Sequence, residues 1–299
     1  MNLLSLPKTE IAALLKKQGL FFFVGSFVIK VNSRLPSVVD GLFSLYADYE
    51  LADESYADFH IEINPPKNFR RWYRPQVDFY FDGYRPFKPL PQDQAFALFE
   101  WSFNWCVASH CHTYLILHAA VIEKNGHVVI MPAPPGSGKS TLTAGLVSRG
   151  WRLLSDELAM LSLDSENVIP LPRPVSLKNE SIDIMKEYAP GSVLGPIAHD
   201  TSKGAVAHMK APRNSVMRGN EPAAPRWVIF PKYQANQKAV LEPMNKAQAF
   251  MDLAENAFNY QILRQRAFEK LGGLIDDCQV YRFAYNNLDD ALDVFNRLD

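Results

Sequence analysis

The first third of the chain alternates short apolar runs with polar turns. Residues 21–31, 59–63 and 78–83 are rich in Phe, Val and Ile over lengths typical of strands, and the third run ends in a glycine turn. Residues 92–110 carry apolar side chains at the spacing of a helix. We therefore expect residues 1–112 to form an N-terminal α+β domain, and its sequence does not reveal what it recognises.

The pattern changes near residue 113, where two apolar strands flank a tight turn. Residues 114–122 and 128–131 are almost entirely apolar, and Asn125-Gly126 lies between them. Asn-Gly between apolar runs is the strongest short signal for a hairpin, so the two strands should be antiparallel neighbours. Such a hairpin predicts a mixed sheet instead of a purely parallel one.

The remaining periodic segments complete a chain of the α/β (α+β) class. We expect a hairpin at 158–163 and 168–171, strands at 227–231 and 280–284, and helices within 245–271 and 289–298. These segments assign residues 113–299 to a second domain built on the mixed sheet.

A glycine-rich loop, residues 133–141 (Ala-Pro-Pro-Gly-Ser-Gly-Lys-Ser-Thr), follows the second strand of the hairpin and precedes a predicted helix. A turn of this kind lets consecutive backbone N–H groups point at a phosphate, and the helix N-terminus adds partial positive charge. Ala133 stands where the full pattern has Gly. The residues expected to hold ATP are Pro135, Gly136, Ser137, Gly138, Lys139, Ser140 and Thr141. Lys139 should reach the β- and γ-phosphates, and the Ser140 hydroxyl should ligate Mg²⁺.

An acidic pair, Asp156 and Glu157, begins seventeen residues after Lys139. Both carboxylates interrupt an otherwise apolar run, where they carry a desolvation cost unless a metal ion or a cation offsets it. We therefore expect the pair to face the glycine-rich loop at residues 133–141, which we call the phosphate loop. A solvated strand end is the plainer alternative for an isolated Asp-Glu dipeptide.

Composition limits the classes of partner and the cellular compartment that we expect for this protein. The chain has 31 Lys and Arg against 32 Asp and Glu, so no global field favours nucleic acid or an anionic membrane. The most apolar stretch, residues 20–29, is ten residues long, which is too short to cross a bilayer. Residues 3–19 mix Leu and Ala with charged residues, as in a surface helix and unlike a signal peptide. These features indicate a cytoplasmic protein.

The three cysteines do not suggest a disulfide framework, and their number fits a reducing compartment. Cys106 and His110 lie four residues apart beside Cys111 and His112, but no second Cys/His group supplies the other ligands of a structural zinc site. We favour a helix with buried thiols over a zinc site.

Residues 201–220 contain Lys203, Lys210, Arg213 and Arg218 and no carboxylate. Two interpretations of this positive segment remain open. It is either a mobile solvated connection or a loop that closes over the triphosphate or the acceptor.

The spacing of these motifs resembles that of the HPr kinase/phosphorylase superfamily, and most closely the HPr kinase-related kinase A group, whose catalytic domain has a phosphoenolpyruvate-carboxykinase-like P-loop fold. In that superfamily a histidine precedes the loop lysine by twenty-one residues and an acidic pair follows it by seventeen. His118, Lys139 and Asp156-Glu157 reproduce both intervals. The resemblance covers residues 113–235 well and the rest loosely.

The resemblance implies roles for single residues. Asp156 looks like the general base, Glu157 and Ser140 like metal-side groups, and His118 like a partner that tunes the charge of Asp156. Arg173 or Lys203 could supply a further cation that clamps the phosphate or the acceptor.

The implied activity is transfer of the γ-phosphoryl group of ATP, with Mg²⁺, to a Ser or Thr hydroxyl of a peptide or small protein. Members of the related group resemble components of peptide-modification gene sets. The C-terminal signature that serves the phosphorylase reaction is not visible, so neither HPr as substrate nor phosphorolysis is carried over. Two alternatives stay open: a kinase for a small molecule such as serine or a sugar, and a nucleotide-dependent binding module. A homo-oligomer is compatible with the sequence.

Overall fold

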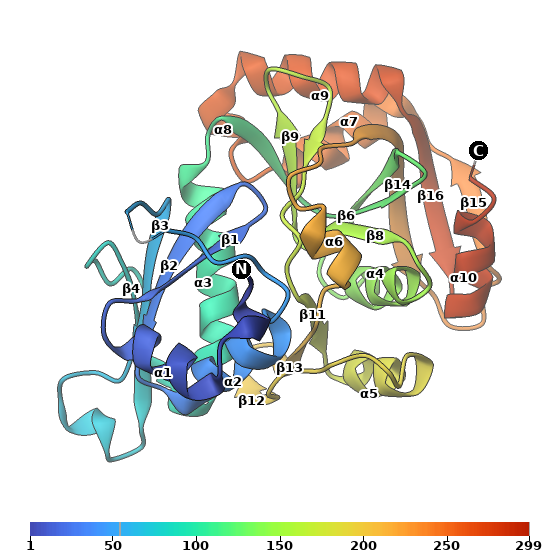
Figure 1. Ribbon diagram of the computed structural model, residues 1–299. Coiled ribbons are helices and arrows are strands. Elements are labelled where there is room, and N and C mark those ends of the chain that lie inside the picture. The colour runs from blue at the N-terminus through green and yellow to red at the C-terminus, as the bar shows by residue number, and fades with distance from the viewer. Residues whose placement is uncertain (54, 299) are drawn as a thin grey trace.

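The computed structural model describes residues 1–53 and 55–298. Its N-terminal part is a five-stranded sheet covered by helices (Figure 1). Strands β2 and β3 are parallel and the other neighbours are antiparallel. The strands, in their order across the sheet, are β1 (Leu20–Val24), β2 (Phe27–Ser33), β3 (Phe59–Asn64), β4 (Gln76–Phe81) and β5 (Leu90–Pro91). The helices are α1 (Lys8–Lys16), α2 (Pro36–Leu45) and α3 (Ala95–His110).

The expectation of one strand over residues 21–31 is wrong, because the chain turns back at Gly25. Val24 and Phe27 are paired across a two-residue turn, and Gly25 has a φ of +59°. A side chain at Gly25 would also lie 2.5 Å from the carbonyl oxygen of Pro170. The apolar run hid this turn because β1 and β2 are both buried and both rich in Phe and Val.

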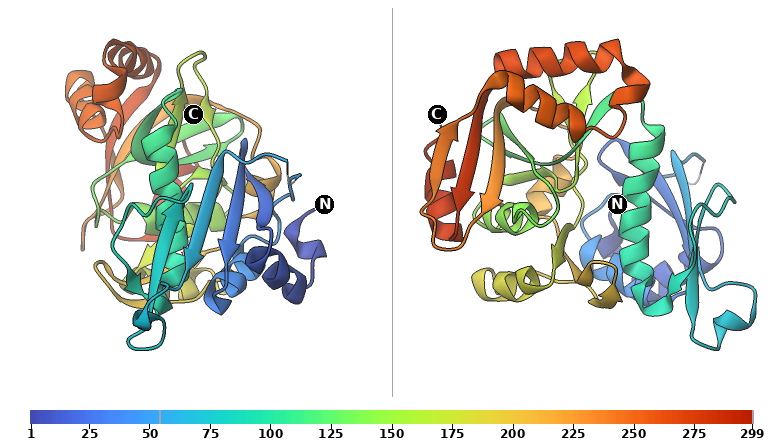
Figure 2. Two further views of the ribbon diagram at one scale, coloured as in Figure 1. Left: turned by 90° about the vertical axis from the view of Figure 1, so that its left-hand side faces the viewer. Right: turned by 180° about the vertical axis from the view of Figure 1, so that it is seen from behind.

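Helix α3 lies between the N-terminal sheet and the rest of the chain (Figure 2). Its buried residues form one broad face, whereas Ala97, Trp101 and Asn104 on the opposite side are half-buried or exposed. The N-terminal core continues into the second half, because it includes Leu158, Met160 and Leu171. A helix of this kind can place side chains at a site on the other half of the molecule.

The large sheet has eight strands and is mixed, as the Asn-Gly hairpin predicted. Strands β6 and β7 are antiparallel across Asn125-Gly126, whereas β7, β14 and β16 are parallel. The strands are β6 (Tyr114–Lys124), β7 (His127–Pro132), β8 (Arg152–Ser155), β9 (Leu158–Ser162), β10 (Val168–Ile169), β14 (Ala224–Tyr233), β15 (Val240–Pro243) and β16 (Gln279–Tyr285). The predicted α/β (α+β) class and the hairpin between β9 and β10 are therefore confirmed.

Helices cover both faces of this sheet, each over its own apolar core. One face carries α4 (Lys139–Ser148) and α10 (Leu288–Phe295), and the other carries α7 (Lys246–Glu255) and α9 (Gln265–Asp277). Helices α5 (Glu180–Tyr188), α6 (Arg213–Met217) and α8 (Tyr260–Leu263) are peripheral. Within the described ranges, no helix is both long and apolar enough to cross a membrane.

The positive segment 201–220 is not an irregular connection. Its first half forms β13 (Gly204–Met209), the middle strand of a three-stranded sheet with β11 (Val175–Lys178) and β12 (Ala198–Thr201), and α6 follows. Several of its basic side chains are paired: Lys210 contacts Asp48 at 2.7 Å, and Arg218 contacts Glu221 at 2.6 Å. The sequence missed these partners because they lie elsewhere along the chain or just outside the segment.

Candidate active site

The phosphate loop joins β7 to α4 and has the backbone geometry that an anion cradle needs. Gly136 and Gly138 have φ values of +83° and +87°, which side-chain-bearing residues rarely adopt. The first N–H group of α4 that donates a backbone hydrogen bond is that of Leu142, and its acceptor is the carbonyl oxygen of Gly138. The N–H groups of Gly138, Lys139, Ser140 and Thr141 have no acceptor within the described chain. The loop therefore presents four free donors at a helix N-terminus.

Two tyrosines from the neighbouring parallel strands hold this loop in place. The Tyr285 hydroxyl donates to the carbonyl oxygen of Gly138 at 2.9 Å, and the Tyr233 N–H donates to that of Ser137 at 2.8 Å. A side chain at Gly138 would lie 2.5 Å from the Tyr285 hydroxyl oxygen. Glycine is required here for its conformation and for this close approach.

Lys139 is a buried cation without a partner. The residue is 6% exposed, and its Nζ forms no hydrogen bond within the described residues. Burial lowers the pKa of Lys139, although the carboxylates of Asp156 and Glu157 act in the opposite direction. A buried ammonium without a partner costs free energy, so an anion that binds beside Lys139 would remove this cost.

Asp156 and Glu157 lie in a bend between β8 and β9, and both of those strands pair with β6. Val121 on β6 is opposite Ser155, and His118 is opposite Leu158. The acidic pair thus occurs where the chain passes from one ladder to the next along the same strand. This break explains why two carboxylates interrupt an apolar run.

Asp156 faces the phosphate loop. Its Oδ2 accepts hydrogen bonds of 3.1 Å from the Ser140 hydroxyl and from the Ser176 N–H. Its Oδ1 has no partner although the residue is 5% exposed. Burial, and then the neighbouring Glu157 carboxylate, raise the pKa of Asp156 to about 6. A carboxylate with this pKa is suited to accept a proton near neutral pH.

Glu157 is anchored from both sides of the site. The Asn104 amide of α3 donates a hydrogen bond to Glu157, and Lys178 Nζ lies 3.9 Å from its other carboxylate oxygen. Burial alone would raise the pKa of Glu157, but the cations of Lys178, Arg173 and Lys139 outweigh burial and lower it. Glu157 is therefore a carboxylate held in its charged form.

His118 lines the same cavity as the phosphate loop, but its environment differs from the one expected. Burial and then the Lys139 charge lower the pKa of His118 to about 4, and Glu157 is the carboxylate that opposes them. No hydrogen bond joins His118 to Asp156 in the described part of the chain. His118, which was expected to be a partner of Asp156, is therefore a neutral imidazole whose pKa depends on burial and on the charges of Lys139 and Glu157.

The two expected clamp residues occupy different positions. Arg173 is bound to α3: its guanidinium lies 2.7 Å from the Glu100 carboxylate and donates to Asn104 Oδ1 at 2.8 Å. It lines a neighbouring cavity and not the one at the loop. Lys203 lines both cavities, and its Nζ has no partner among the described residues. Lys203 is the better placed of the two to meet a phosphate.

The cavity at the phosphate loop has a volume of about 1580 Å³, above the 300–1,000 Å³ of roughly drug-sized ligand sites. It extends from the loop past His118 and Glu157 to Asn287 and Asp289. No cluster of three His, Cys, Asp or Glu side chains suitable for a metal occurs within residues 1–53 and 55–298. Magnesium in phosphate sites usually takes one or two carboxylates and completes its shell with phosphate and water, so Ser140 and Glu157 fit it.

Sequence reasoning missed the residues that other elements bring to this site. Asn104 and Glu100 come from α3, Ser176 and Lys178 come from β11, and Tyr285 comes from β16. Only the tertiary fold places them around the glycine-rich loop, the acidic pair and Arg173. The Cys/His cluster lies at the C-terminal end of α3 and in the two residues that follow it, and Cys106 is buried in the N-terminal core.

Comparison with known proteins adds no family to these observations. No protein-family model matches the chain, and no curated protein shows significant similarity to it.

Proposed function

We propose that the protein is an ATP- and Mg²⁺-dependent phosphotransferase that acts on an alcohol hydroxyl. The observation that carries this proposal is a pair of buried, unpartnered groups: the ammonium of Lys139 and Oδ1 of Asp156. Buried charges are normally paired, and leaving one unpaired costs free energy. A triphosphate beside Lys139 and an acceptor hydroxyl at Asp156 would supply the missing partners.

Each residue then has a defined task. The free loop N–H groups and Lys139 bind the phosphates, and Ser140 with Glu157 would hold the metal ion. When bound, Mg²⁺ neutralises phosphate charge. Asp156 takes the proton of the acceptor hydroxyl, and Lys203 lies where a second cation would help to hold the transferred group. This assignment agrees with the resemblance to the HPr kinase-related group, apart from the clamp role of Arg173 and the role of His118 as a partner of Asp156.

The acceptor is a separate question. The resemblance favours a Ser or Thr of a peptide or small protein in the cytoplasm. One observation favours a small molecule instead. Asp156, whose Oδ1 has no partner, lines a second and much smaller cavity. An open groove would be expected for a protein acceptor.

A transfer assay with γ-labelled ATP tests the proposal. We expect ATP binding that strengthens with Mg²⁺, and labelled product when lysate from the source cell is added. Asp156→Asn should reduce transfer by about 100-fold or more, the usual contribution of a general base, while ATP affinity stays within about twofold. Transfer at the wild-type rate by this variant would remove Asp156 as the base.

Lys139→Ala provides the complementary measurement. It should weaken ATP binding in calorimetry because it removes the cation that faces the phosphates. Unchanged affinity would remove the loop as the phosphate site. ATP binding by the wild type without any labelled product would leave only the binding-module alternative.

A further inference from the structure

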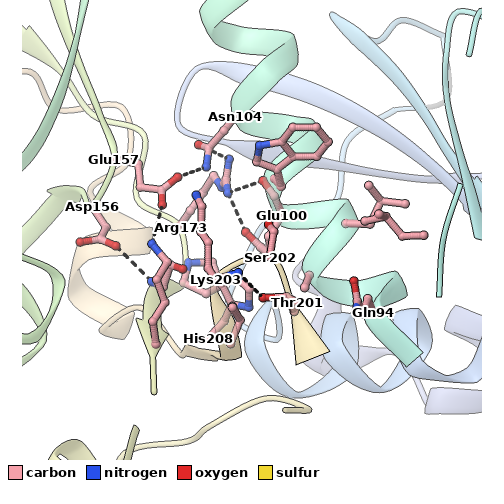
Figure 3. Close-up of a pocket in the computed structure, with 18 of the residues that line it drawn as sticks. Gln94, Glu100, Asn104, Asp156, Glu157, Arg173, Thr201, Ser202, Lys203 and His208 are labelled. Carbon is pink, nitrogen blue, oxygen red and sulfur yellow. Dashed lines mark hydrogen bonds and ion pairs between the residues drawn. The ribbon is translucent and has the colours of Figure 1, made fainter. Parts of the chain in front are cut away.

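A second cavity of about 260 Å³ lies between α3 and the hairpin of β12 and β13, next to the acidic pair (Figure 3). Its walls are mainly apolar and come from both halves of the chain. The apolar side chains that matter here are Leu90, Ala97, Leu98, Trp101, Leu171 and Val206. Its volume is below the roughly 300–1,000 Å³ of drug-sized ligand sites, so it suits a compact molecule.

Three polar groups in this wall lack partners. Asp156 Oδ1 and Arg173 Nε are buried without a hydrogen bond. His208 is 5% exposed and lines the cavity, and no hydrogen bond joins its ring to the described residues. Buried polar groups are nearly always hydrogen-bonded, so several unmet groups around one cavity indicate a ligand that meets them. Burial lowers the pKa of His208, which keeps the imidazole neutral and able both to donate and to accept.

The small cavity opens toward the nucleotide side. Six residues line both cavities: Trp101, Asn104, Glu157, Ser176, Lys178 and Lys203. Asp156 belongs to the wall of the small cavity, while Lys139 and the loop belong to the large one. A molecule in the small cavity would therefore meet a nucleotide in the large cavity at the acidic pair.

We propose that the small cavity is the acceptor site and that it takes a compact amphiphilic alcohol. The inference rests on the proposed phosphotransferase function and deepens it. The hydroxyl of the acceptor lies at Asp156, its apolar body packs between Leu98 and Trp101 on one side and Val206 on the other, and a second hydrogen-bonding group reaches His208 and Arg173.

This placement implies a phosphoryl transfer in which one bond to the γ-phosphorus forms and one breaks. Asp156 takes the hydroxyl proton as the acceptor oxygen forms a bond to the γ-phosphorus. The bond between that phosphorus and the β–γ bridging oxygen breaks, so ADP and a phosphate ester result.

Filling the cavity tests the inference. Ala97 is half-buried on α3 and lines the cavity, so Ala97→Phe places a ring in it, and Ala97→Leu is a milder version in case the larger change disturbs folding. Ala13→Phe on the exposed side of α1 is the matched control. The probe is γ-labelled ATP, supplied with either the low-molecular-weight ultrafiltrate or the retained protein fraction of source-cell lysate.

We expect the wild type and Ala13→Phe to label a compound in the ultrafiltrate, and Ala97→Phe to reduce that labelling at least tenfold, with Ala97→Leu in between. The affinity for a non-hydrolysable ATP analogue should stay within twofold in all four proteins, which shows that they are folded. Labelling confined to the protein fraction, or full labelling of the ultrafiltrate compound by both Ala97 variants, would overturn the acceptor site but leave the kinase. Failure of the wild type to bind the analogue would instead overturn the proposed function, and the acceptor site with it.

Discussion

The Ser140 hydroxyl donates a hydrogen bond of 3.1 Å to Asp156 Oδ2, and this contact joins the first turn of α4 to the bend between β8 and β9. The two residues are sixteen positions apart in sequence. A hydroxyl in this position can either bond to the carboxylate or turn toward a metal ion. The contact therefore links the nucleotide side of the site to its proposed base.

This relationship predicts a specific effect of Ser140→Ala. The variant should lose most of the gain in ATP affinity that Mg²⁺ gives, because a metal-side oxygen is missing, while Mg²⁺-free affinity stays within about twofold. Ser140→Thr keeps the hydroxyl and serves as the control. Calorimetry with and without Mg²⁺ measures both, and an unchanged Mg²⁺ effect in Ser140→Ala would contradict the metal role.

Lys139→Met should stabilise the ligand-free protein while it weakens ATP binding. Methionine has a similar shape and leaves no buried ammonium unpaired. We expect a gain of about 1–3 kcal/mol in the free energy of unfolding, the usual cost of an unmet buried polar group. Urea unfolding without nucleotide measures it. A loss of stability would show that Lys139 is satisfied without a ligand.

Two glycines of the loop differ in what surrounds them, which provides a matched pair of variants. Gly138→Ala would bring a methyl group within 2.5 Å of the Tyr285 hydroxyl oxygen, whereas nothing lies within 4 Å of a side chain at Gly136. Both have positive φ, so each variant carries strain of roughly 1 kcal/mol, but only Gly138→Ala should also displace the loop and abolish ATP binding. Equal ATP affinities in the two variants would show that the Tyr285 contact does not position the loop.

The Glu100–Arg173 pair should be structural. Both side chains are at most 8% exposed, and Glu100 also accepts a 2.7 Å hydrogen bond from the Tyr46 hydroxyl. Glu100→Ala leaves a buried guanidinium unpaired and should cost about 3–5 kcal/mol of unfolding free energy. Asp183→Ala removes a surface pair with Lys186 and should cost less than about 1 kcal/mol. Similar losses in urea unfolding would mean that Arg173 finds other partners.

The lowered pKa of His118 predicts a pH dependence of stability. Burial and the Lys139 charge lower it to about 4 in the folded protein, against about 6.5 in the unfolded chain. As the pH falls below 6.5 the unfolded chain binds the proton first, so stability decreases between pH 6.5 and 4. From pH 7 to pH 5 the wild type should lose about 2 kcal/mol more than His118→Gln, in which this group is absent. Parallel pH profiles for the two proteins would contradict the buried neutral imidazole.

The sequence predicted the elements whose signals are local. Asn125-Gly126 fixed a hairpin because that dipeptide adopts the positive φ values such a turn requires, and the structure has φ of +54° and +84° there. The glycine-rich loop could be located for the same reason. By contrast, the turn at Gly25 was missed, because a buried hairpin and a single long strand have the same uninterrupted apolar pattern.

What the sequence by itself determined is the strand-loop-helix unit around residues 133–141 and the placement of an acidic pair seventeen residues beyond its lysine. The tertiary structure alone decided which groups surround that pair. It brought Asn104 of α3 to Glu157, tied Arg173 to Glu100, and formed the small apolar cavity between α3 and β13. The physical reason is that the contacts of Glu157 and Arg173 with α3 join residues 53 to 73 positions apart, and no local conformational preference encodes a contact at that separation.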